Sequence, residues 1–576
     1  MTNGQNSDWR PIKLSAKVFG HISQGLYRTP AGAIKELVSN AFDADATTVK
    51  IHTGFPRFET FSCEDNGKGL SRDEFDRLME QGIGTSLKRS DEEQETEIYH
   101  RRVIGRLGIG LLSLAQICTE FDLYSHCAED KRAFVVTLRF PAYTKQEIDR
   151  IKARSSKDMI EGGKYKVKDI EFDSNQKGVR IFTRFLREPF RKRMSNLSRF
   201  GNHVLNESKA PYSSFDDFLA AIYKAKDIFR SLTLASDYDQ LLFGLSLLPP
   251  LTYFDSNSNI MLSIPFMEEY NLRLKRNDFH LFVDNLELTR PLKLPSDQKR
   301  RSAAECKVER HTLKSLALVD GAHKEKVQVQ KFYISIANAD ERFSAYHVKY
   351  SNQKVAGRPL AFWGYLFQQT GRVYPRDIQG VIVRIRDVAI GTYDNSLMTY
   401  PYGEGPRYSM VSGEFIVEQG FEDALNIDRD SFNSLDPHYL RMQAYLHALL
   451  HDIIFPETWG EEKSRNKERR DVAKEERRKT FVRFLRDQSG GKFTRIRRLE
   501  LEDSETKDPV KFSPTKKAVI LNVNHPLLRE VLRRHKYEEL VEQITIAFEK
   551  AHLESSADKQ REVFYAFLSK IFGSQP

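Results

Sequence analysis

Cysteine is scarce in this chain, with four residues among 576, and none of them is spaced as a CxxC pair. The sequence therefore predicts no zinc module, and the few thiols fit a reducing compartment. Long hydrophobic runs are also missing: no stretch of about 18 apolar residues occurs, so we expect no transmembrane helix. The first residues, MTNGQNSDWRPIKLS, lack the apolar core of a signal peptide. We expect a cytoplasmic protein without a membrane partner.

Positive charge is not spread evenly along the chain. The net charge is +10, but residues 461–498 hold fifteen Lys or Arg and seven Asp or Glu, which leaves about +2 for everything else. Mixed charges of this kind usually form a solvated helix laced with ion pairs. The surplus also suits contact with nucleic acid through residues 463–498, independent of base sequence because no base-reading motif is present. Both interpretations stay open.

Length and periodicity divide the chain into parts, because 576 residues are too many for one core. The first 190 residues mix helix and strand patterns and predict an α/β fold, an α+β sandwich with helices on one face of a mixed sheet. Pro-Pro in LLPPL marks a boundary near residue 250. The predicted domains are a first α/β domain (1–190), a helical connector (191–250), a second α/β domain (251–456), a basic charged helix or linker (457–491) and a mixed helical C-terminal region (492–576).

One predicted helix carries an unusual polar stripe. In IKELVSNAFDADAT, residues 34–47, the side chains of Glu36, Asn40 and Asp43 fall on one helical face, and the opposite stripe is apolar. Such a stripe is either the solvated side of an amphipathic helix or part of a functional site. An amide and a carboxylate one turn apart could ligate Mg²⁺ and deprotonate a water.

Two glycine-rich stretches follow this helix. DNGKGL starts at Asp65 after a predicted strand, where a carboxylate can accept a hydrogen bond from the amine of a base and glycines allow close approach. GRLGIG, residues 105–110, opens a predicted helix whose N–H groups and dipole favour phosphate. Each motif alone is weak, since DNGKGL is more often a plain turn and GRLGIG matches neither a Walker loop nor the Rossmann order.

Together, in this order and within about 80 residues, the three motifs closely resemble those of the Bergerat-type ATPases, the GHKL superfamily. ELVSNAFDADA resembles the N box, DNGKG the first glycine box and GRLGIGLLS the second. The resemblance implies an ATP hydrolase with a Bergerat-type domain over residues 1–190 and with ATP and Mg²⁺ as cofactors. It makes Glu36 the general base, Asn40 the Mg²⁺ ligand and Asp65 the reader of adenine.

Other nucleotide contacts implied by the resemblance lie mostly in loops. The polar, unpatterned stretch 85–102 is interpreted as a mobile loop that serves as the ATP lid, and Val179 stands where the family usually has a Thr that helps to bind adenine. Besides Asn40 and Asp65, the implied cofactor-binding residues are Asp43, Gly67, Gly69, Ser86, Lys88, Gly105, Arg106, Leu107, Gly108, Ile109, Gly110 and Leu111. For Ser86 and Lys88, a solvated loop face is an equally good interpretation.

Within the superfamily the chain resembles the 90-kDa heat-shock chaperones and the MORC proteins. It has no room for the phosphoacceptor helix of a histidine kinase, and it lacks the QTK loop of type II topoisomerases and the DQHA-type motif of MutL-type endonucleases. GEFIVEQGFEDALNIDRDSF resembles the chaperone middle-domain stretch that ends in a catalytic arginine. Arg429 is therefore a candidate sensor of the γ-phosphate, delivered by a transducer-like domain at 251–456. A surface ion pair with Asp428 or Asp430 is the alternative.

The resemblance also implies how ATP would be used. Members of the superfamily commonly dimerise when ATP binds, so we expect a homodimeric, nucleotide-gated clamp. Two hypotheses follow for its partner. The clamp acts on nucleic acid, MORC-like, in defence against foreign DNA, or the chain is a chaperone-like ATPase or recruiting switch whose client is a protein.

Overall fold

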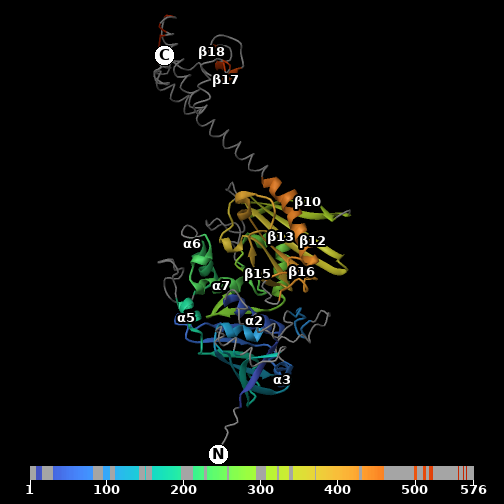
Figure 1. The fold of residues 1–576 in the computed structure, drawn as a ribbon. Helices are drawn as coiled ribbons and strands as arrows, with labels where there is room; N and C mark the ends of the chain where they lie inside the picture. The colour runs from blue at the N-terminus through green and yellow to red at the C-terminus, as the bar shows by residue number, and fades with distance from the viewer. Residues whose placement is uncertain are drawn as a thin grey trace, which may run out of the picture. The chain divides into compact units, whose positions relative to one another are not determined.

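A computed structural model divides the chain into two compact units, Met1–Pro456 and Glu457–Pro576 (Figure 1). In the first unit the structure describes residues 8–15, 30–81, 95–103, 110–141, 150, 159–195, 212–225, 230–255, 259–292, 306–320, 323–336, 342–369, 371–426 and 431–456. In the second unit it describes 457–458, 498–502, 510–513, 518–522 and a few single positions beyond. No helix in these ranges is long and apolar enough to cross a membrane.

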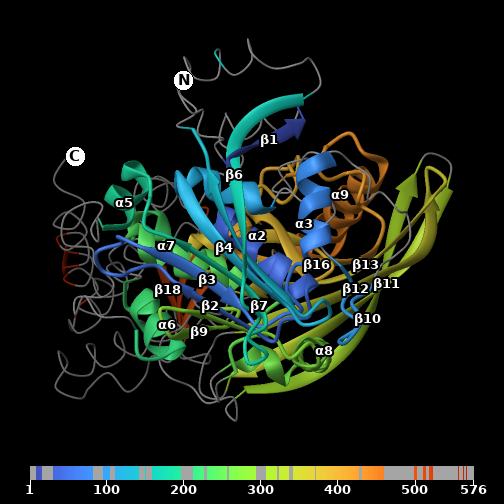
Figure 2. The same cartoon turned by 90° about the horizontal axis from the view of Figure 1, so that it is seen from below.

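The first unit begins with a nine-stranded sheet in the order β1-β6-β5-β4-β7-β3-β2-β8-β9 (Figure 2). Its strands are β1 (Arg10–Ser15), β2 (Thr48–His52), β3 (Phe61–Asp65), β4 (Glu120–Cys127), β5 (Arg132–Arg139), β6 (Met159–Ile170), β7 (Gly178–Thr183), β8 (His280–Val283) and β9 (Leu286–Leu288). β2 and β8 run parallel, and every other neighbouring pair is antiparallel. Buried residues alternate with accessible ones along β4, as expected for a sheet with one covered face.

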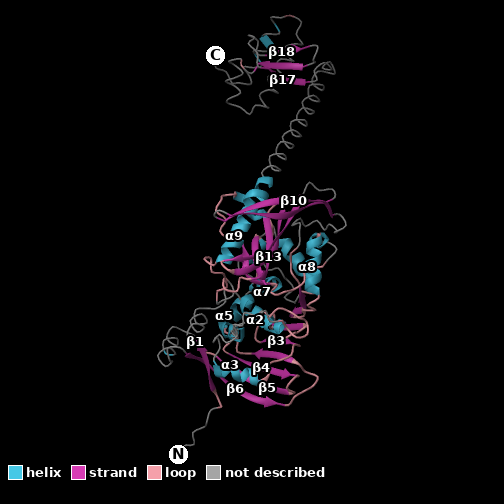
Figure 3. Cartoon of the chain, turned by 90° about the vertical axis from the view of Figure 1, so that its right-hand side faces the viewer, coloured by secondary structure: helices cyan, strands magenta, loops and turns pink. Residues whose placement is uncertain are grey.

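Helices cover that buried face (Figure 3). They include α2 (Pro30–Asp43), α3 (Arg72–Gln81), the 3-10 helix η1 (Gly110–Gln116), α5 (Glu188–Ser195) and α7 (Asp237–Leu247). α3 starts at a capping box, in which Ser71 Oγ accepts from the Glu74 amide and the Glu74 carboxylate accepts from the Ser71 amide. Phe75 of α3 packs its ring against Phe134 and Tyr165 of the sheet. The predicted α+β sandwich is confirmed.

A second sheet of seven strands follows, in the order β10-β11-β12-β13-β16-β14-β15. Its strands are β10 (Cys306–Asp320), β11 (His323–Ile336), β12 (Arg342–Val355), β13 (Arg358–Gln369), β14 (Gly380–Ile385), β15 (Val388–Asp394) and β16 (Val411–Gln419). α9 (Pro437–Leu449) packs on one face and continues into a π-helical turn, Leu450–Ile454. Side chains of the other face join the core of the first sheet, together with α6 (Phe215–Lys224) and α8 (Pro265–Lys275). One hydrophobic core therefore runs from the first sheet to the second.

The predicted boundary near residue 250 does not separate the two sheets. β8 and β9 lie beyond it, yet β8 pairs with β2 and completes the first sheet. The hairpin HLFVDNLEL shows an ordinary strand pattern, and such a pattern carries no information about which sheet a strand joins. The second unit contains a small sheet in the order β17-β19-β18, formed by Arg498–Glu502, Ala518–Asn522 and Val510–Ser513.

Candidate functional site

Part of the polar stripe of α2 is buried rather than solvated. The apolar residues opposite it are buried as expected, but Glu36 is buried too, with 5% of its surface exposed. Its neighbour Lys35 is 1% exposed, and the Lys35 Nζ lies 4.0 Å from Glu36 Oε1. Asn40 is exposed, while Asp43 is half-buried. Burying a carboxylate costs free energy, and Lys35 is the charged partner that offsets part of this cost for Glu36.

α2 is buried because two other elements pack tightly on it. α7 approaches so closely that a Cβ on Gly244 would lie 2.7 Å from the Cβ of Ala31. On η1, Ser113 Oγ donates to the carbonyl of Ala33 at 2.8 Å. η1 begins with Gly110 and Leu111, the end of the second glycine box, so this contact joins that box to the N-terminal part of α2.

Asp65 stands at the end of β3 with its two carboxylate oxygens in different environments. Oδ1 accepts hydrogen bonds from the amides of Gly67, at 2.9 Å, and Val179, at 3.3 Å. Within the described ranges no hydrogen bond reaches Oδ2. Burial raises the pKa of Asp65 from its ordinary 3.8 to about 6, although the two amides favour the charged form. At neutral pH the group is an anchored carboxylate that can accept one further N–H donor.

Two glycines are required for this arrangement of Asp65. A Cβ on Gly67 would lie 2.6 Å from the carbonyl oxygen of Ala44, just after α2. Gly178 has φ +95°, and a Cβ there would lie 2.1 Å from the carbonyl oxygen of Asp65. Only glycine fits either position. Gly178 was not predicted from the sequence, because one glycine before a strand looks like any turn.

Asn66 fixes the first glycine box to the segment that follows α2. Its Oδ1 accepts from the amides of Thr47 and Thr48, both at 2.9 Å, and its Nδ2 donates to Thr47 Oγ1 at 2.8 Å. The amide of Lys68 donates to the carbonyl of Ala44 at 2.9 Å. The end of α2 and the first glycine box therefore form one hydrogen-bonded unit. The motif predicted the glycines, but not this role of the asparagine.

The end of the stretch predicted as a mobile lid is firmly held, and for residues 95–102 the mobile-loop interpretation is wrong. Asp45, with φ +58°, accepts from the amides of Ile98 at 3.0 Å and Tyr99 at 3.3 Å. Arg101 is 2% exposed and donates to the carbonyls of Phe42 and Ala46 at 3.1 and 2.7 Å, which places its charge at the C-terminus of α2. A polar sequence without periodicity hides such contacts, because they depend on carbonyls distant in the sequence.

The described part of the chain thus brings together Glu36, Asn40 and Asp43 on α2 with Asp65, Gly67 and Gly69 beside its C-terminus. The other predicted site residues lie outside the described residues: Ser86, Lys88, Gly105, Arg106, Leu107, Gly108, Ile109 and Arg429. The described residues on either side of Arg429 pair with each other after β16. Leu425 forms an antiparallel bridge with Phe432, and the amide of Asn426 donates to the carbonyl of Ser431 at 3.0 Å.

Comparisons with known proteins match the region that holds this site. Residues 27–174 fit the family described as histidine kinase-, DNA gyrase B-, and HSP90-like ATPase. A putative type II restriction enzyme, HgiDII of Herpetosiphon aurantiacus, is 33% identical over 114 residues, 20% of this chain and 18% of that protein. The DNA mismatch repair protein MutL of Trichlorobacter lovleyi is 32% identical over 105 residues, 18% of this chain and 17% of that protein. The chain thus spans less than a fifth of the length of these relatives.

Similarity to solved structures covers more of the chain but is loose. The N-terminal domain of a DNA repair protein aligns with 76% of this chain and 98% of its own, at a TM-score of 0.33 and 12% identity. The ATPase region of Saccharomyces cerevisiae topoisomerase II aligns with 75% of this chain and 85% of its own chain, at a TM-score of 0.32 and 9% sequence identity.

The family match and the motif residues agree on the same segment. The N box and first glycine box are adjacent in the structure, and the end of the second glycine box packs on the same helix. The expected placement in the heat-shock chaperone and MORC branch stays a prediction. Residues 27–174 belong to the GHKL ATPase superfamily.

Proposed function

We propose that this chain binds ATP with Mg²⁺ and hydrolyses it at the site formed by α2 and the two glycine boxes. The observation that carries the proposal is Asp65, which has one oxygen fixed by two backbone amides and no hydrogen bond to the other within the described ranges. An ionised acceptor at the end of a strand, next to glycines that admit a planar ring, suits the amino group of adenine. The amide of Val179 helps to orient this carboxylate, so the missing Thr hydroxyl leaves the acceptor in place.

The residues of α2 fit the Mg²⁺ and phosphate end of ATP. Asn40 is exposed between the buried residues Ser39 and Ala41, so its amide oxygen is accessible to a cation. Bound Mg²⁺ would supply electrostatic stabilisation of the phosphates. Glu36, one turn before Asn40, would accept the proton of an attacking water, and its burial limits competition from bulk solvent.

Arg429 is proposed to stabilise the charge that develops on the γ-phosphate. The described residues on either side of Arg429 support this role, because Leu425 bridges Phe432 and the amide of Asn426 donates to the carbonyl of Ser431, which holds the two ends of the intervening segment together. A guanidinium delivered from a second sheet would make hydrolysis depend on the arrangement of both sheets.

The biological role that we propose is a homodimeric, ATP-gated clamp on DNA. The matched relatives are described as a restriction enzyme and as DNA mismatch repair proteins, and the basic segment 463–498 supplies charge for phosphate contacts. A role in defence against foreign DNA belongs to the same hypothesis. The alternative is a chaperone-like ATPase or recruiting switch with a protein client.

Steady-state hydrolysis of Mg-ATP by the wild type and Glu36→Gln tests the enzyme. The glutamine keeps volume and polarity but cannot take a proton, so we expect kcat to fall by about 10²–10⁴-fold with ATP affinity retained. Glu171→Gln, at an exposed position, is the matched control and should hydrolyse normally. Wild-type turnover in Glu36→Gln would refute the general-base role.

Duplex DNA added to the same assay distinguishes a DNA partner from a protein client. Stimulation that weakens with salt and disappears when Lys and Arg of 463–498 are neutralised supports the DNA clamp. Stimulation by unfolded protein but not by DNA would favour the protein client. Sedimentation of Glu36→Gln with and without ATP tests the dimer, which should accumulate when hydrolysis is blocked.

A further inference from the structure

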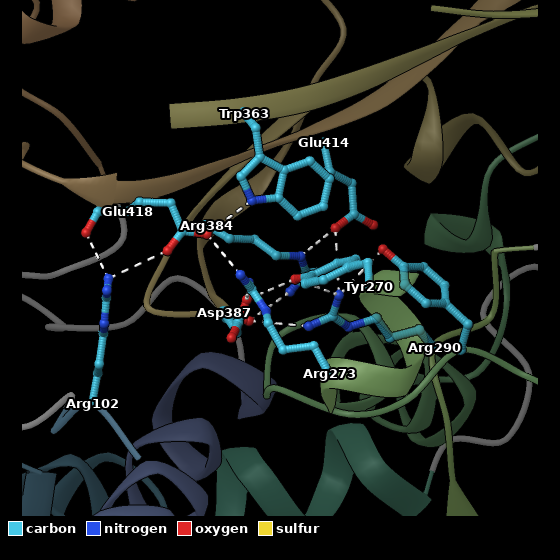
Figure 4. A network of polar contacts seen from close by, with 10 residues as sticks. Arg102, Tyr270, Arg273, Arg290, Trp363, Arg384, Asp387, Glu414 and Glu418 are labelled. Atoms are coloured by element: carbon cyan, nitrogen blue, oxygen red, sulfur yellow. Dashed lines mark hydrogen bonds and ion pairs between the residues drawn. The ribbon is translucent and has the colours of Figure 1, made fainter. Parts of the chain in front are cut away.

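Two consecutive residues at the base of the predicted lid are held by the second sheet. Arg102 donates through one guanidinium nitrogen to the backbone carbonyl of Glu418 at 2.6 Å and lies 3.3 Å from the Glu418 carboxylate (Figure 4). The next residue, Val103, accepts at its carbonyl from Arg386. Glu418 belongs to β16 and Arg386 to the turn between β14 and β15. Residues more than 280 positions apart in the sequence are thereby joined.

Glu418 also bonds to residues of other elements. Its Oε2 faces Arg102, while its Oε1 accepts from Arg273 of α8 at 2.7 Å and from the indole N–H of Trp363 at 2.8 Å. Arg273 also donates to Asp387, the residue after Arg386, at 2.7 Å. One carboxylate thus connects the base of the predicted lid with α8, β13 and the β14–β15 turn (Figure 4).

Next to these surface contacts lies a buried cluster of charged residues, called the anchor below. Arg290, Arg384 and Glu414 are all fully buried; Arg384 bonds to the Glu414 carboxylate, and Arg290 lies 3.7 Å from it. Arg290 also donates to the carbonyl of Asp387 at 3.1 Å. Moving one buried ion would leave another uncompensated, so this cluster resists rearrangement. Asp387 is consequently held in place, so a displacement of Arg102 is not compensated by a movement of Asp387.

The outer contact differs from the anchor in its exposure. The side chains of Arg102 and Glu418 are 37% and 32% exposed, against 0% and 1% for Arg384 and Glu414. Ion pairs that are this accessible are weak and exchange readily with water. The arrangement therefore combines an ion pair that can break, between Arg102 and Glu418, with a buried cluster that stays fixed when it does.

The position of the joint in the chain links it to the nucleotide site. Arg101 caps the C-terminus of α2, and the second glycine box starts two residues after Val103. Residues 102 and 103 thus lie between two parts of the site. We propose that Arg102 and Glu418 are positioning residues that transmit nucleotide occupancy of the site to β16 and the second sheet. This inference rests on the proposed ATP binding.

Hydrogen–deuterium exchange of the full chain tests it, with and without a non-hydrolysable ATP analogue and Mg²⁺. Peptides covering β16 and the β14–β15 turn should change their exchange when the analogue binds to the wild type. In Arg102→Ala this change should shrink about fivefold, while the Kd for the analogue stays within about twofold. Arg102→Lys, which keeps the charge, should restore most of it.

A double-mutant cycle identifies the contact. Glu418→Gln keeps the backbone carbonyl that Arg102 reaches and removes only the carboxylate charge, so it should reduce the response less than Arg102→Ala does. The double variant should be no worse than Arg102→Ala, because Arg102→Ala already removes the whole contact between the two residues. Arg139→Ala breaks an ion pair with Glu120 at 2.5 Å on the first sheet and serves as the control with an unchanged response.

Three results would overturn the inference. An analogue that binds to the wild type without altering exchange in β16 refutes the transmission but leaves ATP binding standing. A response that survives in Arg102→Ala, or additive losses in the cycle, shows that another route carries it. Failure of the wild type to bind the analogue, measured directly by calorimetry, removes the proposed function and the inference together.

Discussion

Replacing Asp65 by Asn should make the fold more stable while it impairs nucleotide binding. Burial raises the pKa of Asp65 from 3.8 to about 6, a shift of about 2 units. At about 1.36 kcal/mol per unit, the ionised carboxylate lowers the free energy of unfolding by ~3 kcal/mol at pH 7. Asn removes this charge, and its oxygen can still accept from the amides of Gly67 and Val179. Because its NH₂ group gains no partner there, we expect a net stabilisation of about 1–3 kcal/mol.

The size of this effect depends on pH in a defined way. The folded state holds the Asp65 proton more tightly than the unfolded state, so the penalty disappears below about pH 3, where both states are protonated. It grows as pH rises from about 4 to 6 and is constant above. The advantage of Asp65→Asn should therefore shrink by ~2 kcal/mol between pH 7 and pH 4.5.

The same substitution should change which base is preferred. With the Asn oxygen held by the two amides, its NH₂ group occupies the place of Oδ2 and faces the amino group of adenine, donor against donor. Hypoxanthine carries a carbonyl oxygen at that position, so ITP would gain a partner where ATP loses one. The ratio of the two Kd values should move toward ITP by about 10–100-fold.

Urea unfolding checks stability, read by a short hydrogen-exchange pulse on peptides that cover β3 and β7. These peptides report on the first sheet alone, whereas a global signal would mix the transitions of two units. Asp239→Asn is the control: burial also raises the pKa of Asp239 to about 6, but it lies in the first turn of α7 and should not affect nucleotide affinity. A less stable Asp65→Asn at pH 7, or an advantage independent of pH, would refute the electrostatic reasoning.

Two further substitutions test the neighbourhood of the site. Gly178→Ala should destabilise the first sheet by ~3 kcal/mol and weaken ATP binding, because its Cβ would collide with the carbonyl of Asp65. Gly357→Ala is the control: Gly357 has φ +79° but no atom within 4 Å of an added Cβ, so the variant should lose only ~1 kcal/mol and bind ATP normally. Arg101→Ala should lower the urea midpoint, by ~2–4 kcal/mol in unfolding free energy. The variant loses hydrogen bonds to the carbonyls of Phe42, Ala46 and Asn277 and the aromatic contacts of the guanidinium with Phe42, Tyr99 and Phe279. Equal stability of wild type and Arg101→Ala would mean that the α2 cap is unimportant.

Local patterns predicted those elements whose cause is local. The apolar stripe of α2 follows from its 3.6-residue period. β1 and β6 were not predicted. β6 contains the sequence EGGKYKVKD, in which two glycines and many charges obscure the alternation, although β6 pairs with both β1 and β5.

Features with a distant cause could not be predicted. The sequence places Glu36 on a polar stripe, but it does not show that α2 is covered by α7, which lies about 200 residues later. The partner of β2 in the sheet is β8, and the partner of Arg102 is Glu418. Each depends on the path of the chain between the two, which no window of residues records.

The motifs predicted the residues that we expect to face a ligand and missed those that hold them. The resemblance of the motifs implied the role of Asp65, whereas Asn66 and Gly178 serve only the backbone around it. The same division applies at the base of the predicted lid, where the sequence singled out neither Arg101 nor Arg102. Their environments are opposite: Arg101 is sealed against α2, and Arg102 reaches an accessible carboxylate of the second sheet. A buried arginine followed directly by an accessible one is what a joint requires, since one residue must stay fixed for the other to move against it.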